Sequence, residues 1–183
     1  MKLSPIKTIH KSLFCFAFLL FNCLTAFSQG SPNTSYPNEF KLNVGWFIVD
    51  GTIEAAYEYF INSESSIGAT AYYDGDSSDA LGKFGIGPNF RVYFGKRYAN
   101  GVYAEAFGLY YTGTLSEDVI ADMPRINQDF NTFALGFGIG FKLLTRSSNF
   151  SLDVNAALGR NLTQESLQDA FVGKGGISVG FRF

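Results

Sequence analysis

The chain has 183 residues, a length that favours a single domain, and it is 46% hydrophobic, 17% aromatic and only 16% charged. This composition is too aromatic and too poor in charge for a disordered chain, and two cysteines are too few for a disulfide scaffold. The formal net charge of -2 excludes a generally basic nucleic-acid binder, so no nucleic acid is expected as a partner. An all-β protein is the remaining class.

The first 28 residues have the layout of a secretory signal peptide. Lysines at positions 2, 7 and 11 precede a short apolar core at 13–24, and Ala26-Phe27-Ser28 forms an A-x-S cleavage site. The apolar run is too short to span a bilayer as a helix. We therefore expect cleavage after Ser28, a polar periplasmic leader at 29–38, and one folded domain at 39–183.

An alternative interpretation makes Cys23 the lipidated first residue of a lipoprotein. The residues before it include Phe21 and Asn22, which are bulky where lipoprotein signals carry small side chains. Cleavage after Ser28 remains the favoured prediction.

Cleavage would remove every thiol and imidazole from the chain. Cys15, Cys23 and His10 are all the Cys and His residues of the sequence. Without them, the mature chain cannot form a Ser-His-Asp triad, a Cys–His pair or a Cys/His zinc site, and Met123 is the only methionine left to ligate a haem. We expect no enzymatic activity, no cofactor and no metal site, although paired carboxylates could still act as general acid and base.

Hydrophobicity alternates with a period of two along most of the mature chain. In residues 133–143, for example, Phe, Leu and Ile alternate with Ala, Gly and Lys. Strands of about ten residues match a tilted strand that crosses a membrane, and the large apolar face suits lipid while the small, charged face suits a narrow lumen. Closure is then required, because an open edge leaves backbone groups unpaired in lipid. The sequence predicts an all-β, eight-stranded, antiparallel, up-and-down transmembrane β-barrel with strands near 39–49, 52–61, 65–74, 83–94, 102–112, 131–143, 149–159 and 172–183.

The connections between these strands alternate in length. A tight Asp50-Gly51 turn is expected after the first strand. Short turns on one side and longer loops on the other are typical of outer-membrane barrels, so the short turns and both termini should face the periplasm. The short connections are near 62–64, 95–101 and 145–148, and the longer ones are near 75–82, 113–130 and 160–171.

Charged residues recur on the predicted lumen face. Buried charges must pair or stay hydrated, and an eight-stranded barrel is just wide enough for side chains to fill it. We expect a structural network of paired charges that plugs the lumen; a gated conduit and acid–base catalysis by Glu54 and Glu58 are weaker alternatives. The inward phase of the fifth strand is open, because Glu105 shares its face with Tyr103 and Phe107. The predicted lumen residues are Lys41, Glu54, Glu58, Arg91, Glu105, Lys142, Asp153, Lys174 and Arg182.

Two further features lie in the longer loops and near the strand ends. Carboxylates cluster in two loops, at Asp74, Asp76 and Asp79 and at Glu117, Asp118, Asp122 and Asp129; solvated loops are favoured over a Ca²⁺ site. Aromatic residues near the strand ends are expected to form interfacial girdles. The inner girdle would hold Phe40, Phe94, Phe141, Phe150, Phe181 and Phe183, and the outer one Tyr72, Tyr73, Phe84, Tyr110 and Tyr111.

The chain ends with apolar residues at alternate positions and a terminal Phe183. This ending resembles the final-strand signal that the barrel-assembly machinery reads, with Phe181 and Phe183 as its aromatic positions. The mature chain as a whole resembles small eight-stranded outer-membrane barrels, similar in form to OmpX and the OmpA membrane domain. In detail it resembles an uncharacterised barrel family of unknown function, in residues 57–59, 87–94, 101–103 and 136–142. The resemblance implies a fold and a location, and it implies no activity.

The resulting expectation is an outer-membrane protein of a Gram-negative-type cell with a structural or surface-interaction role. Its partners would be outer-membrane lipids, the barrel-assembly machinery and a surface or envelope protein that the sequence does not identify. The alternatives are a narrow passive channel for water or small solutes and an outer-membrane lipid-modifying hydrolase. The hydrolase is disfavoured because the mature chain lacks His.

Overall fold

The computed structural model describes residues 36–75, 82–117, 126–163 and 169–183. The predicted signal peptide and most of the leader therefore lie outside the described residues. The described elements are β1 (Asn38–Asn43), α2 (Val44–Val49), β2 (Ile53–Phe60), β3 (Ser65–Tyr73), β4 (Phe84–Tyr93), β5 (Gly101–Glu117), β6 (Ile126–Leu144), β7 (Phe150–Asn161) and β8 (Phe171–Arg182).

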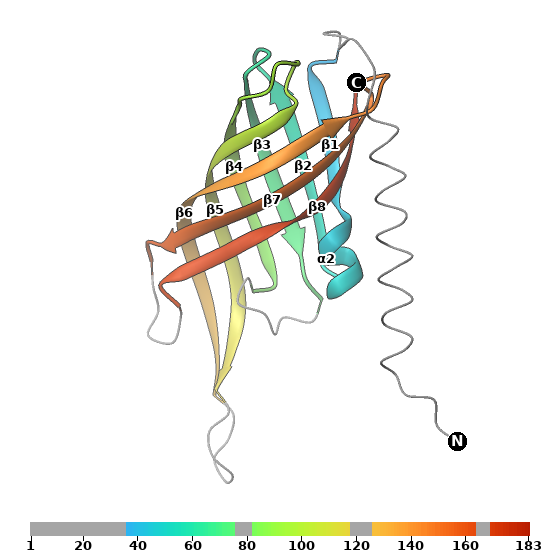
Figure 1. Ribbon diagram of the computed structural model, residues 1–183. Helices are drawn as coiled ribbons and strands as arrows, with labels where there is room; N and C mark the ends of the chain where they lie inside the picture. The colour runs from blue at the N-terminus through green and yellow to red at the C-terminus, as the bar shows by residue number, and fades with distance from the viewer. Residues whose placement is uncertain (1–35, 76–81, 118–125, 164–168) are drawn as a thin grey trace, which may run out of the picture.

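The eight strands form one closed antiparallel barrel in sequence order (Figure 1). Each strand pairs with the next, and β1 closes the barrel against β8, with Glu39 opposite Arg182 and Asn43 opposite Ser178. The predicted fold class is confirmed. Within the described part of the chain, no helix is both long enough and apolar enough to cross a membrane.

The first predicted strand, 39–49, is wrong in its second half. β1 ends at Asn43, and residues 44–49 form the short helix α2. The Asn43 side chain caps this helix by accepting a hydrogen bond from the Trp46 backbone N–H, and the Asp50 N–H donates to the Trp46 carbonyl at 3.0 Å. The Asp50-Gly51 turn thus follows a helix instead of joining two strands directly, and Gly51 has the positive φ of +81° that glycine allows.

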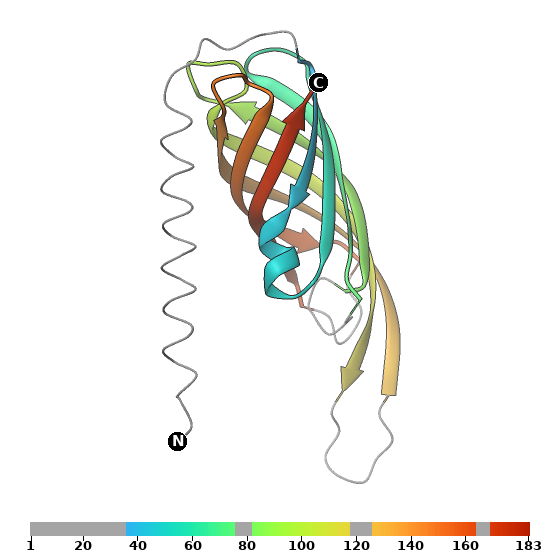
Figure 2. The same ribbon diagram turned by 90° about the vertical axis from the view of Figure 1, so that its right-hand side faces the viewer.

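The β5–β6 hairpin is longer than predicted. β5 has 17 residues and β6 has 19, and their pairing runs out to Glu117 opposite Ile126. Figure 2 shows this two-stranded ribbon extending beyond the other strands of the barrel. Residues 112–117 are mostly polar and lack the alternation of the other strands, so the sequence pattern did not reveal the extension.

The two faces of the wall follow the predicted alternation. On β6, Phe137 is 77% exposed on the outside, whereas Lys142 is 0% exposed on the inside. The sequence left open which residues of the fifth strand face inward. In the structure Tyr103, Glu105 and Phe107 all point into the lumen. The barrel interior therefore mixes charged and aromatic side chains.

The predicted outer aromatic girdle is partly wrong. Tyr73, Phe84 and Tyr110 are exposed on the outer surface as expected, but Tyr72 and Tyr111 are buried inside the barrel. Adjacent residues of a strand point to opposite faces, so only one tyrosine of each neighbouring pair can face outward.

The short turns lie at one end of the barrel. The turns after β2, β4 and β6 are at the same end as the C terminus, at the top of Figure 1. In the turn after β4, Ala99 has a φ of 43° and its N–H donates to the Ser63 carbonyl at 2.8 Å. This bond ties two of the short turns together across the mouth of the barrel.

Candidate functional site: the ion-pair network of the lumen

The charged lumen residues come from seven of the eight strands. Each lies on the inward phase of its strand, so the period-two pattern alone brings residues far apart in sequence to one layer. Ion pairs join β1 to β2, β6, β7 and β8, and β4 to β2, β5 and β7. The predicted lumen residues Lys41, Glu58, Arg91, Glu105, Lys142, Asp153, Lys174 and Arg182 all belong to this network.

Glu58 is the acceptor at the centre of the network. Its Oε2 lies 2.6 Å from Lys41 Nζ, 2.9 Å from Lys142 Nζ and 3.3 Å from Arg91 Nη1. Its Oε1 accepts hydrogen bonds from the Ser66 hydroxyl and the Tyr93 hydroxyl. Three cations and two hydroxyl groups thus saturate one buried carboxylate, which is the condition for burying such a charge without a large desolvation penalty.

Asp153 is the second acceptor, on the opposite part of the wall. Its Oδ2 accepts from Arg91 Nη1 at 2.6 Å and lies 3.4 Å from Lys41 Nζ, and its Oδ1 accepts from the Tyr103 hydroxyl at 2.5 Å. Arg91 also donates through Nε to Glu105 Oε2 at 2.7 Å. The Arg91 guanidinium therefore bridges three carboxylates from three other strands.

Glu39 is a lumen residue that the sequence interpretation missed. Its Oε2 accepts from Arg182 Nε at 2.8 Å and from Lys142 Nζ at 3.2 Å, and its Oε1 accepts from the Ser151 hydroxyl at 2.7 Å. It shares the inward phase of Lys41, and that phase could have revealed it. With Glu39 added, the wall strands carry five lumen carboxylates beside the five lumen cations, and Asp74, directly after β3, is a further buried carboxylate. The cations are Lys41, Arg91, Lys142, Lys174 and Arg182, and the carboxylates of the strands are Glu39, Glu54, Glu58, Glu105 and Asp153.

Glu54 and Lys174 lie farther from the central carboxylate. Glu54 Oε1 accepts from Asn43 Nδ2 at 3.2 Å, and Lys174 Nζ lies 3.2 Å from Glu105 Oε1. Glu54 is thus inside the barrel as predicted, although a hydrogen bond to Asn43 holds it. Glu58 is surrounded by three cations, whereas Glu54 accepts from a neutral amide, so the two carboxylates have different surroundings.

Aromatic side chains close the short-turn end of the lumen. Phe60, Tyr93 and Tyr103 form a buried cluster with Ala99 of the turn after β4, and Tyr98 packs against it. Two cations of the network lie over these rings. The Arg182 guanidinium carbon is 4.2 Å from the Phe60 ring centroid, and the Arg91 guanidinium carbon is 4.5 Å from the Tyr103 ring centroid. These contacts are cation–π interactions between buried groups.

The other half of the interior is mainly aromatic and aliphatic, with buried polar residues such as Thr132 and Asn161 among them. Its buried cluster comprises Tyr72, Phe107, Leu109, Tyr111, Phe130, Ala134 and Val172. Inward glycines make room for the larger rings: a Cβ at Gly85 would lie 2.3 Å from Tyr72, and one at Gly136 would lie 2.5 Å from Phe107. The lumen therefore has an ionic half near the termini and an aromatic half near the longer loops.

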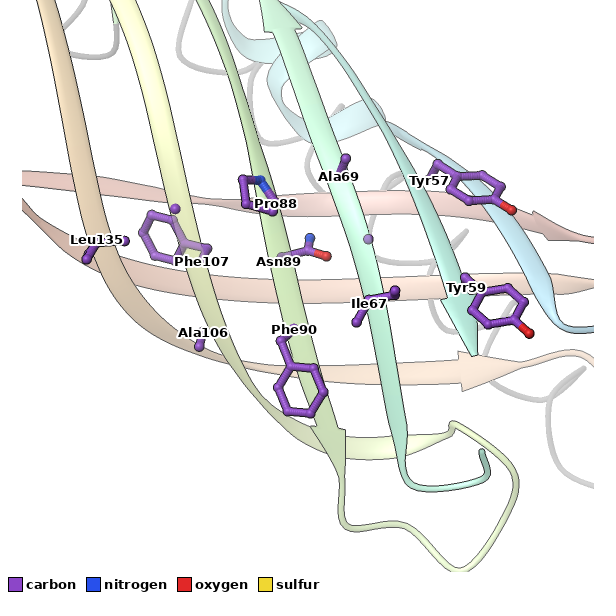
Figure 3. Close-up of a pocket in the computed structure, with 12 residues that line it drawn as sticks. Tyr57, Tyr59, Ile67, Ala69, Pro88, Asn89, Phe90, Ala106, Phe107 and Leu135 are labelled. Atoms are coloured by element: carbon purple, nitrogen blue, oxygen red, sulfur yellow. The ribbon is translucent and has the colours of Figure 1, made fainter. Parts of the chain in front are cut away.

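The outer surface has a hollow of about 770 Å³ in its apolar belt (Figure 3). The small residues Gly68, Ala69, Ala106 and Gly108 leave this space beside Pro88. Tyr57, Tyr59, Phe90 and Leu135 line it from the outer face, and the buried residues Asn89 and Phe107 line it from the barrel wall.

The described residues contain no cluster of three or more Cys, His, Asp or Glu side chains with the spacing of a metal site. The predicted acidic loops are tested only in part. Asp129 accepts a hydrogen bond from the Thr114 hydroxyl at 2.8 Å. Asp74 is only 4% exposed, so its assignment to a solvated loop is wrong. Asp76, Asp79, Asp118 and Asp122 lie outside the described residues.

The chain matches no family model and no curated protein. Among solved structures it is similar to the N-terminal β-barrel domain of OprF from Pseudomonas aeruginosa, with 13% sequence identity and a TM-score of 0.49. The match covers 80% of this chain and 96% of that one. The eight-stranded architecture itself stands on the strand pairings described above.

Proposed function

We propose that the protein is an outer-membrane β-barrel with a structural or surface-interaction role and a lumen plugged by paired charges. The supporting observation is the inverted distribution of side chains. Large apolar residues cover the outside of a closed barrel, and the ion pairs lie inside it. A water-soluble protein rarely exposes so large an apolar surface, whereas lipid requires it.

The chain would reach this location through its predicted signal peptide and the barrel-assembly machinery. Phe181 and Phe183 are both exposed on the outer face of β8 and at the chain end, where a recognition signal would be accessible. The remaining partners are outer-membrane lipids along the apolar belt and a surface or envelope protein at the longer loops. The proposed role includes no enzymatic step.

A narrow channel is the weaker alternative. The ionic half of the lumen is filled by side chains with 0–4% exposure, and the aromatic cluster of Phe60, Tyr93 and Tyr103 closes its end. A lipid-modifying hydrolase is weaker still, because the predicted mature chain has no His to act as a base.

The proposal is tested by electrophoresis and flotation. A closed barrel whose lumen charges are paired should resist unfolding by SDS, so unheated protein should migrate differently from boiled protein. Protein refolded with lipid vesicles should float with the vesicles. Membrane fractions of the native cell should contain the protein. Identical migration before and after boiling, with recovery in the soluble fraction, would contradict the membrane assignment.

A further inference from the structure

The barrel wall has a seam between β8 and β2. β1 pairs with β8 only as far as Asn43 opposite Ser178. Residues 171–177 of β8 therefore pair with β7 on one side and have no described strand on the other. An unpaired strand edge is costly at membrane depth, since lipid offers its N–H and C=O groups no partner.

Helix α2 lies over the part of this seam that residues 175–177 of β8 form (Figure 1). The Trp46 indole N–H and the Asn43 side-chain amide both donate to the Gly175 carbonyl. The backbone of Gly45 lies against β8, because a Cβ placed there would be 3.0 Å from the Ile177 nitrogen. Both side-chain bonds thus end on a single carbonyl.

The sequence of α2 suits a strand better than a helix. Residues 44–49 read Val-Gly-Trp-Phe-Ile-Val, in which β-branched and aromatic residues favour strands and glycine disfavours helices. No side chain of α2 is buried, and Val49 is 80% exposed. If β1 continued in its present register, Val44 would lie opposite Ile177 and Trp46 opposite Gly175, and the edge of β8 would be paired.

The helical form leaves a groove of about 300 Å³ at the seam. One wall is α2 and the other is the stretch of β8 that contains Gly175 and Gly176, where side chains are absent. The apolar residues Phe47, Ile48 and Val49 continue the belt beside it, and α2 carries no charge. The residues that line the groove are Gly45, Trp46, Val49, Gly175, Gly176 and Ile177.

We propose that this groove binds the acyl chain of a membrane amphiphile, and that residues 44–49 open and close it by passing between helix and strand. The lining is apolar and continuous with the belt that faces lipid, so an acyl chain is the occupant whose chemistry fits it. In the strand form, the extended β1 fills the groove and pairs the edge of β8. The proposal rests on the proposed location in the membrane.

Two pairs of cysteines distinguish the two forms, and the predicted mature chain has no other cysteine. In the helical form, a Cβ on Gly45 lies 3.6 Å from the Ile177 Cβ, which suits a disulfide. Gly45→Cys with Ile177→Cys should therefore lock the groove open. In the strand form, residues 44 and 177 lie directly opposite each other, so Val44→Cys with Ile177→Cys should lock the groove closed.

Trp46 is the only tryptophan of the chain and lines the groove, so its fluorescence reports the occupant. The probe is dibrominated stearic acid, titrated into phosphatidylcholine vesicles that hold the wild-type protein or an oxidised variant. We expect saturable quenching of Trp46 for the wild type and for the oxidised Gly45→Cys/Ile177→Cys variant. The oxidised Val44→Cys/Ile177→Cys variant should lose the saturable component of the quenching and regain it when the disulfide is reduced.

Quenching that rises in proportion to bromine content without saturating would overturn the proposal, because it would mean that α2 only touches bulk lipid. Equal saturation in both locked variants, or failure of the Val44/Ile177 pair to oxidise, would overturn the helix–strand gate. Each sample is first checked for heat-modifiable migration and flotation. A failure at that step would count against the membrane location, whereas a failure in the titration counts against the groove.

Discussion

Glu58→Gln is expected to lower the free energy of unfolding by about 3–5 kcal/mol, the range for breaking a buried ion pair from one side. The substitution keeps the shape of the side chain and removes its charge. Lys41 and Lys142 then lose the carboxylate oxygen that lies within 3 Å of both ammonium groups. Neither lysine can reach water, because both are almost fully buried.

The loss is measured by urea unfolding of the barrel refolded in lipid vesicles. Glu64→Gln is the matched control, because Glu64 lies in an exposed turn and its change should alter stability by about 0.5 kcal/mol or less. Adding Lys142→Met to Glu58→Gln restores the charge balance and should recover part of the loss. A Glu58→Gln variant as stable as the Glu64→Gln control would show that the network does not hold the barrel together.

Phe183→Ala is expected to reduce the amount of barrel in the outer membrane several-fold while changing its stability little. Full burial of a large apolar side chain contributes about 1.5–3 kcal/mol, and Phe183 is 52% exposed, so its own contribution is smaller. A large loss in the cell must then come from recognition by the assembly machinery.

The side-chain substitution is a cleaner test than deletion of Phe183. The Phe183 N–H donates to the Asn38 carbonyl at 3.0 Å, and its carbonyl accepts from the Asn38 N–H at 3.2 Å, so deletion would also remove the bonds that close the barrel. Phe150→Ala is the control, because Phe150 is 51% exposed and also lies against Phe181. Membrane levels are compared by quantitative immunoblotting. Normal levels of Phe183→Ala, or an equal fall for Phe150→Ala, would contradict a targeting role.

The period-two pattern predicted most of the fold because successive residues of a wall strand alternate between the apolar outside and the lumen of the barrel. The same pattern failed at Trp46 and Ile48. Alternation reports which face a residue would occupy if the segment were extended, and it does not report whether the segment is extended. The local cap that Asn43 provides favours the helix, and the bonds to Gly175, which depend on the tertiary structure, hold it against β8.

The lumen residues were predicted about as well as the strands, and the errors have similar causes. Eight of the nine predicted lumen charges are in ion pairs, and Glu54 is held by Asn43. Tyr72 and Tyr111 were assigned to the wrong face because tyrosine suits both an interface and a lumen, and each stands beside a second tyrosine. Partner choice within the network, such as the triple contact of Arg91, depends on strand register, which the sequence does not specify.

The measurement that tests the central claim most directly is the conductance of the wild-type protein in planar lipid bilayers. The sample is first shown to be a folded barrel by its heat-modifiable migration, so that an absence of conductance cannot be attributed to unfolded protein. Because Glu58, Arg91, Lys142 and Asp153 fill the lumen and Phe60 and Tyr93 close its end, no steady conductance should appear. Reproducible open channels in pure wild-type protein would contradict the account.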